Sequence, residues 1–223
     1  MRISQSLCLL GLFCLPVALL TCGDDSTKPS DTPSPFLSRT SPENLLHNLL
    51  EAYEHRSVAE YESLLARNFT FILSGEDPDR PGVPGEWERE SEIRLHDCMF
   101  AASTELLHLD FAPGTCAWDS AAAAWAILAT KVDLHLYGVI PGRESDGPQL
   151  FVIENTWSRF WFAETGPATG DLAGWLAPGT NDPVWKIIKW KDNPIAKEGG
   201  DKPDVPASWG WLKGFYLHCP EKS

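Results

Sequence analysis

Helical and strand-like patterns are separated along this chain, and their order limits the fold more than any other feature. Apolar residues recur at helical spacing within about 42–54 and 57–65, and a third helix is predicted from about 86 to 101. After a first strand at 68–73, only strand-like runs rich in β-branched and aromatic residues follow: 105–111, 122–137, 149–164 and 184–191. Helices followed by antiparallel strands are typical of an α+β domain whose helices cover one face of the sheet.

The first two predicted helices carry start signals. Ser41 stands at an N-cap position, Pro42 follows at the first helical position, and Glu43 adds an acid to the first turn. Ser57 and Glu60 have the spacing of a capping box. These residues predict two short helices packed in tandem.

Alternation in the run 122–137 assigns its side chains to two faces of a sheet. The apolar set is expected to share one face: Leu128, Val132, Leu134 and Leu136. The polar set is expected to share the other: Lys131, Asp133, His135 and Tyr137.

The size and charge of the chain narrow its class. Its 223 residues have room for one domain with a core large enough to fold without metals or staples. The 31 acidic residues outnumber the 18 basic ones, and such a surface repels phosphate backbones. We therefore expect no nucleic-acid partner.

The N-terminal segment has the pattern of an export signal. Arg2 precedes an apolar run over residues 7–20, which is too short for a membrane span and ends at Cys22 before a polar stretch. The ending Leu-Leu-Thr-Cys resembles the lipobox of bacterial lipoproteins, which implies an acylated Cys22 and cleavage before it. We expect a signal peptide over 1–21, a lipidated, disordered tether over 22–41, and a location in the cell envelope outside the cytoplasm. A secreted protein with a free Cys22 is the alternative.

The helices and first strand also carry a family resemblance. The sequence LLEAYEHRSVAEYESLLARNFTF, residues 49–71, resembles the opening of the ketosteroid isomerase and nuclear transport factor 2 superfamily. Trp87-Glu88-Arg89-Glu90 and Trp209-Gly210-Trp211-Leu212-Lys213 resemble segments of uncharacterised bacterial lipoproteins. The resemblance implies a cone-shaped, strongly bent antiparallel sheet of about four to six strands. It also implies three N-terminal helices, a domain over 42–193 and a pocket between helices and sheet. A second copy of the chain, paired through the sheet, is one possible partner that the resemblance implies.

The resemblance also implies where an isomerase would place its catalytic groups. The tyrosine position of the first helix holds Leu49, and the position of the general base on the first strand holds Leu73. A leucine cannot transfer a proton, so this activity is not expected.

Other groups could supply acid–base chemistry. They are His96 with Asp97, and two pairs that each project to one face of a strand: His108 with Asp110, and Asp133 with His135. A solvated outer sheet face is the favoured interpretation of the two strand pairs. His96 and Cys98 are spaced like two metal ligands, but no second such pair exists, so no metal or cofactor is predicted.

A ligand site is predicted on the strand 149–164. Trp157, Arg159 and Trp161 project to one face and could form an aromatic wall with one cation for a small apolar or anionic ligand. The alternative is that these aromatic rings fill the packed layers of the sheet.

Three cysteines remain in the mature chain if Cys22 is acylated, so one of them must stay free. One pair among Cys98, Cys116 and Cys219 could close in an oxidising compartment, and position in loops favours Cys116 with Cys219. The extension 194–223 is expected to pack on the domain, with binding to a partner as the alternative.

Two functions follow as hypotheses. The first is a membrane-tethered, non-catalytic ligand-binding or protein-interaction domain, anchored by lipid on Cys22. The second is a small enzyme of the isomerase or dehydratase type with an acid or base not yet located.

Overall fold

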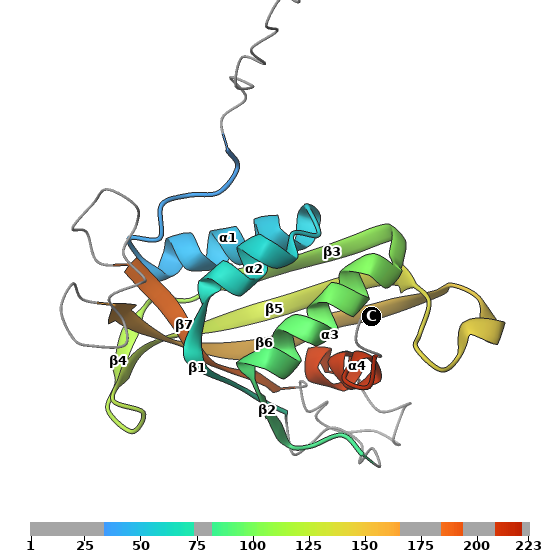
Figure 1. Ribbon diagram of the computed structural model, residues 1–223. Helices are drawn as coiled ribbons and strands as arrows, with labels where there is room; N and C mark the ends of the chain where they lie inside the picture. The colour runs from blue at the N-terminus through green and yellow to red at the C-terminus, as the bar shows by residue number, and fades with distance from the viewer. Residues whose placement is uncertain (1–33, 74–81, 166–183, 194–207, 220–223) are drawn as a thin grey trace, which may run out of the picture. The chain divides into compact units, whose positions relative to one another are not determined.

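The computed structural model describes residues 34–73, 82–165, 184–193 and 208–219 (Figure 1). The predicted signal peptide and Cys22 lie outside these residues. Within the described residues, no helix has the length and apolarity needed to cross a membrane.

The elements follow the predicted order. The helices are α1 (Pro42–Glu54), α2 (Val58–Leu64), α3 (Arg89–Ala102) and α4 (Trp209–Tyr216), with a short 3-10 turn at Glu144–Asp146. The strands are β1 (Leu65–Ile72), β2 (Glu86–Glu88), β3 (Ser103–Pro113), β4 (Ala117–Asp119), β5 (Ala124–Gly138), β6 (Gln149–Thr165) and β7 (Val184–Asn193). The fold class is α+β, as predicted.

One curved sheet joins all the described strands, in the order β2-β1-β7-β6-β5-β3, with β4 on β5. Its seven strands exceed the four to six expected. The pairing of β1 with β7 is parallel, whereas an antiparallel sheet was expected. β7 thus pairs with β6 in the antiparallel direction on one edge and with β1 in the parallel direction on the other.

The helices α1, α2 and α3 lie on one face of the sheet (Figure 1). The predicted caps are confirmed: the Ser41 hydroxyl accepts from the Asn44 amide, and the Ser57 hydroxyl accepts from the Glu60 amide. These bonds satisfy amides that the first turn of a helix leaves without partners.

The third helix starts later than predicted. Residues 86–88 form β2, which pairs antiparallel with β1, and α3 begins at Arg89. Trp87 stacks on Phe71 with ring centroids 4.4 Å apart, so a contact with a strand distant in sequence overrides the local helical pattern.

The predicted faces of β5 hold for Val132, Leu134 and Leu136, which are buried, but not for Leu128, which is exposed. The ladder shifts register between Thr130 and Val132, and Lys131 there has a positive φ of 52°. An extra residue at a β-bulge reverses the side-chain alternation, so Ile127 and Ala129 take the core face instead.

Segments before and after the predicted range 42–193 also contact the domain. Before α1, the Arg39 carbonyl accepts from the Trp185 amide, and the Asn48 side chain bonds both backbone groups of Leu37. After β7, the helix α4 packs against α3 and β7. The compact unit therefore begins at Ser34 rather than Pro42.

A disulfide joins Cys98 of α3 to Cys219, with Cα atoms 6.4 Å apart. Cys116, which was favoured as the partner of Cys219, is free. Cys219 reaches Cys98 because α4 docks beside α3 and Cys219 follows the C-terminal end of α4.

Candidate functional site

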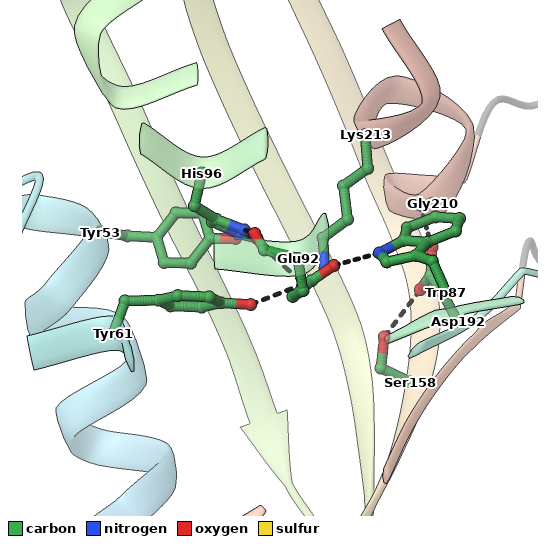
Figure 2. Close-up of polar contacts among 9 residues, drawn as sticks. All are labelled: Tyr53, Tyr61, Trp87, Glu92, His96, Ser158, Asp192, Gly210 and Lys213. Carbon is green, nitrogen blue, oxygen red and sulfur yellow. Dashed lines mark hydrogen bonds and ion pairs between the residues drawn. The ribbon is translucent and has the colours of Figure 1, made fainter. Parts of the chain in front are cut away.

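A group of polar side chains lies inside the domain, between α3 and α4 (Figure 2). Glu92 of α3 is its centre, and its carboxylate accepts from the Tyr61 hydroxyl at 2.6 Å, from the Trp87 indole and from the Lys213 ammonium. We call the following residues the interior polar cluster: Tyr53, Tyr61, Trp87, Glu92, His96 and Lys213.

Glu92 and Lys213 form a buried ion pair, and both side chains have 0% exposure. Burial tends to raise the pKa of Glu92, but the nearby Lys213 charge and the hydrogen bonds hold it below its usual value. Burial lowers the pKa of Lys213 to about 8, although Glu92 opposes this shift. At neutral pH the cluster therefore holds a carboxylate and an ammonium in contact.

His96 lies one helical turn after Glu92 and is neutral. Burial lowers its pKa to about 3. Its Nδ1 lies 2.8 Å from the Glu92 carbonyl oxygen, which can only accept, so Nδ1 carries the proton and Nε2 accepts from the Tyr53 hydroxyl. The Tyr61 ring stacks on the imidazole at 3.8 Å.

The two tyrosines of the cluster stay protonated. Burial, reinforced by the Glu92 charge, raises the pKa of Tyr53 and of Tyr61 well above 10. Each hydroxyl therefore acts as a fixed hydrogen-bond donor to its partner.

The helix α4 is anchored over the cluster by a second buried carboxylate, Asp192 of β7. Its oxygens accept from the Ser158 hydroxyl at 2.7 Å and from the Gly210 amide at 2.8 Å (Figure 2). Burial raises the pKa of Asp192. The Gly210 amide lies in the first turn of α4, where carboxylates are favoured.

The cluster contains the group types of an acid–base site, but it is sealed. Tyr53, Tyr61, Glu92, His96 and Lys213 all have 0% exposure, and Trp87 has 5%. Each polar tip is paired with another side chain or the backbone. In this state no substrate can reach these groups.

The positions that the resemblance assigned to isomerase catalysis belong to the hydrophobic packing of the domain. Leu49 is part of the core, and Leu73 packs against it. Both are apolar, as the sequence indicated, and the titratable groups come from other positions on α1, α2, α3 and α4.

The predicted aromatic wall is on the opposite face of the sheet. Trp157, Arg159 and Trp161 alternate with Ser158 and Phe160, which face the core. The Arg159 guanidinium lies 5.8 Å from the Trp161 ring and 3.9 Å from Asp119, which also accepts from the Trp161 indole. The side chain of Arg159 is 44% exposed, so any ligand of this wall would bind on the outer surface.

The two polar strand pairs meet across the sheet. In the pairing of β3 with β5, His108 lies opposite His135 and Asp110 lies opposite Asp133. Each histidine also approaches a carboxylate, His108 that of Glu54 at 3.8 Å and His135 that of Glu154 at 3.5 Å. Across the described residues, no three such side chains are grouped closely enough to hold a metal.

A surface pocket of about 540 Å³ lies where the segment before β2 meets α3 and the end of α4. Val83, Pro84 and Leu217 contribute apolar lining, while Ser91 and His218 contribute polar groups. It is open to solvent, and Trp87 of the interior polar cluster is one of its lining residues.

The sequence interpretation missed the role of Glu92 and Lys213. One signal was present, because Glu92 and His96 are four residues apart on the same helical stripe as Leu95 and Met99, which are buried. The contact between Lys213 and Glu92 could not be predicted from sequence, since 121 residues separate them.

No family model matches the sequence, and no curated protein matches it. Solved structures do match. An NTF2-like protein of unknown function in nutrient uptake from Rhodospirillum rubrum is 13% identical, with a TM-score of 0.41 over 70% of this chain and 99% of that one. An NTF2-like superfamily protein from Salmonella enterica is 16% identical, with a TM-score of 0.43 over 72% and 92%.

A putative SnoaL-like polyketide cyclase from Shewanella denitrificans is 12% identical, with a TM-score of 0.38 over 67% and 87%. In fold, the chain is similar to these NTF2-like proteins. The similarity concerns the arrangement of helices and sheet and carries no information on activity.

Proposed function

We propose that this protein is a lipoprotein, held outside the cytoplasm by acylated Cys22, whose domain binds a protein partner and catalyses no reaction. The observation behind the absence of catalysis is the sealed interior. A catalytic acid or base must reach its substrate within hydrogen-bond distance, and Glu92, His96 and Lys213 have 0% exposure.

The disulfide supports the proposed location. Disulfides persist in oxidising compartments, which include the bacterial periplasm and the cell surface. Cys98 and Cys219 form such a bond, and it fixes the helix that closes the interior. Residues 23–33, which are mostly polar, lie between Cys22 and the compact unit in the sequence, as a tether requires.

The proposed interaction surface lies on the sheet face turned away from the helices. All the exposed large apolar side chains of the described part except Leu37 belong to β4, β5 and β6. On β6, Leu150 is 58% exposed and Val152 is 50% exposed, and they pair with Tyr137 and His135 of β5. Leu150 and Val152 lie two residues apart on one face of β6, and neighbouring exposed apolar side chains favour a protein interface.

The test is site-specific photo-crosslinking in the cells that make the protein. A photoreactive residue at Val152 or Leu150 should give one discrete adduct, whereas the same residue at Glu90, exposed on α3, should give none. An adduct with the mass of two copies of this chain would identify the partner as a second copy. Equal labelling at Val152 and Glu90, or none at either, contradicts the proposed surface.

The alternative is a small enzyme of the isomerase or dehydratase type. The observation in its favour is that the interior gathers a neutral imidazole and two phenols near the Glu92 carboxylate. This function requires α4 to leave the cluster before any substrate can bind. A substrate-like small molecule that copurifies and survives native mass spectrometry would favour it.

A further inference from the structure

The Lys213 ammonium has the surroundings of a bound ligand rather than of a surface lysine. Its nitrogen lies 3.7 Å from the centre of the Trp190 ring and 3.9 Å from that of Phe71. The Trp209 ring lies 5.3 Å away. Aromatic faces attract cations, and the attraction is stronger where water is excluded. Figure 2 shows this side chain reaching from α4 to Glu92 in the interior.

The counter-charge is held in place by groups other than Lys213. The Glu92 carboxylate accepts from the Tyr61 hydroxyl and the Trp87 indole, which orient it toward the nitrogen. Asp192 is also buried and close enough to favour the charged form of Lys213. The site therefore combines aromatic faces with a fixed anion, the two features that recognise an organic cation.

Most of this site belongs to the sheet and the helices that precede α4. Phe71 lies on β1, Trp190 on β7 and Glu92 on α3, whereas Trp209 and Lys213 arrive together on α4. The described contacts that hold α4 over the site include the Asp192–Gly210 hydrogen bond and the Cys98–Cys219 disulfide. Three of the four groups around the nitrogen therefore come from elements other than α4.

We propose that the cage of Phe71, Trp190, Trp209 and Glu92 is a binding site for the primary ammonium group of a small organic amine, and that Lys213 occupies it in the place of that ligand. The matching ligand has an unbranched alkyl stem, like that of lysine. It carries no carboxylate near the nitrogen, because Glu92 and Asp192 would repel a second anion in this buried space.

The test is chemical rescue of the full-length, oxidised Lys213→Ala variant. Butylammonium should raise its melting temperature by about 3 °C or more at concentrations well above its dissociation constant. Butanol, which has the same stem without a charge, and butyrate should give much smaller shifts. Equal shifts in butylammonium and butanol, or none in either, would overturn the proposal.

Two matched variants control for the cage. Lys213→Met fills the space of the stem, so its melting temperature should not respond to butylammonium. Lys213→Ala combined with Glu92→Gln should lose the preference for butylammonium over butanol. If the preference persists without the carboxylate, the cage is not the binding site.

A second measurement covers the case in which Lys213→Ala does not fold. The protein with Cys98→Ser and Cys219→Ser keeps Lys213 but lacks the bond that fixes α4. Butylammonium should compete with Lys213 and speed amide hydrogen exchange in residues 209–216, whereas butanol should not. Unchanged exchange in butylammonium overturns the proposal. Neither experiment involves the outer sheet face. A negative result in both would therefore overturn the amine site and leave the proposed function unaffected.

Discussion

Glu92 keeps its charge in the interior because three donors from separate elements replace the water that it lacks. The hydroxyl of Tyr61, the indole of Trp87 and the ammonium of Lys213 all reach the one carboxylate. A buried carboxylate with fewer partners would be driven to take up a proton. At the residue scale, the stability of the interior therefore depends on this set remaining complete.

The first residue-scale prediction concerns the ion pair. Glu92→Gln leaves the Lys213 ammonium buried without its anion and should lower the free energy of unfolding by about 3–5 kcal/mol. Urea denaturation measures this loss. Glu90→Gln, an exposed site on the same helix, should change it by no more than about 0.5 kcal/mol. A loss for Glu92→Gln as small as that of the control would show that the pair is not important for stability.

The second residue-scale prediction is a pH dependence caused by His96. Its pKa is about 3 in the folded protein, whereas the ordinary value for a solvated histidine is 6.5. Between these values the unfolded chain binds a proton that the folded protein does not, so stability falls as the pH falls. The slope from this group approaches about 1.4 kcal/mol per pH unit.

Urea denaturation at about pH 6 and pH 5, between the folded and ordinary pKa values of His96, measures this loss of stability. The loss of stability between the two pH values should be smaller in His96→Asn than in the unmodified protein. An unaltered slope in His96→Asn would mean that the imidazole is not held neutral.

At the element scale, α4 is the part that covers the interior polar cluster from the side of α3 and β7. It is docked by an apolar face, by the Asp192–Gly210 hydrogen bond and by the disulfide. Gly210 is needed for the close approach, because a Cβ there would lie 2.7 Å from Leu73 Cδ1 and 3.0 Å from Phe71 Cε1. The glycine of the Trp-Gly-Trp segment thus has a packing role.

Loss of the disulfide gives the first prediction at this scale. The double variant Cys98→Ser with Cys219→Ser should be less stable by about 2–4 kcal/mol, because the bond restricts the unfolded chain across a loop of 121 residues. Guanidinium denaturation without reductant measures this difference. Cys116→Ser, which removes a free thiol, should have a much smaller effect. If Cys116→Ser is the more damaging change, the pairing is wrong.

The packing of Gly210 gives the second prediction about α4. Gly210→Ala should destabilise the protein, because the added methyl group meets Leu73 and Phe71. In a Leu73→Ala background the same change should cost less, with a coupling free energy of about 1 kcal/mol between the two sites. A double-mutant cycle of urea denaturations measures the coupling. Additive effects would mean that α4 does not press against Leu73.

Local signals made the helices predictable, and distant contacts explain what the sequence did not reveal. The Ser41 and Ser57 caps act within one helical turn, so α1 and α2 could be assigned from sequence. The bulge at Lys131 and the pairing of β2 with β1 depend on neighbouring strands, so Leu128 and the start of α3 were misplaced. The interior polar cluster joins residues from five elements, which no local pattern could bring together.

At the scale of the whole molecule, the proposed arrangement is a lipid anchor, a tether and a closed domain that presents one sheet face. Cys22→Ser removes the only thiol that the tether offers for acylation. The variant should leave the membrane fraction or remain uncleaved, as intact mass and detergent partitioning can measure. Cys116→Ser should stay in the membrane fraction. A lipid-bearing N-terminal mass in Cys22→Ser would refute the anchor.

The claim on which the rest depends is that α4 keeps the interior closed. Amide hydrogen exchange of the oxidised, full-length protein tests it most directly, read out on residues 209–216 and 89–102. We predict that α4 is protected to nearly the same extent as α3, because both bury the same polar cluster. Exchange of α4 at the rate of an unfolded chain, with α3 still protected, would show an open interior and contradict this claim.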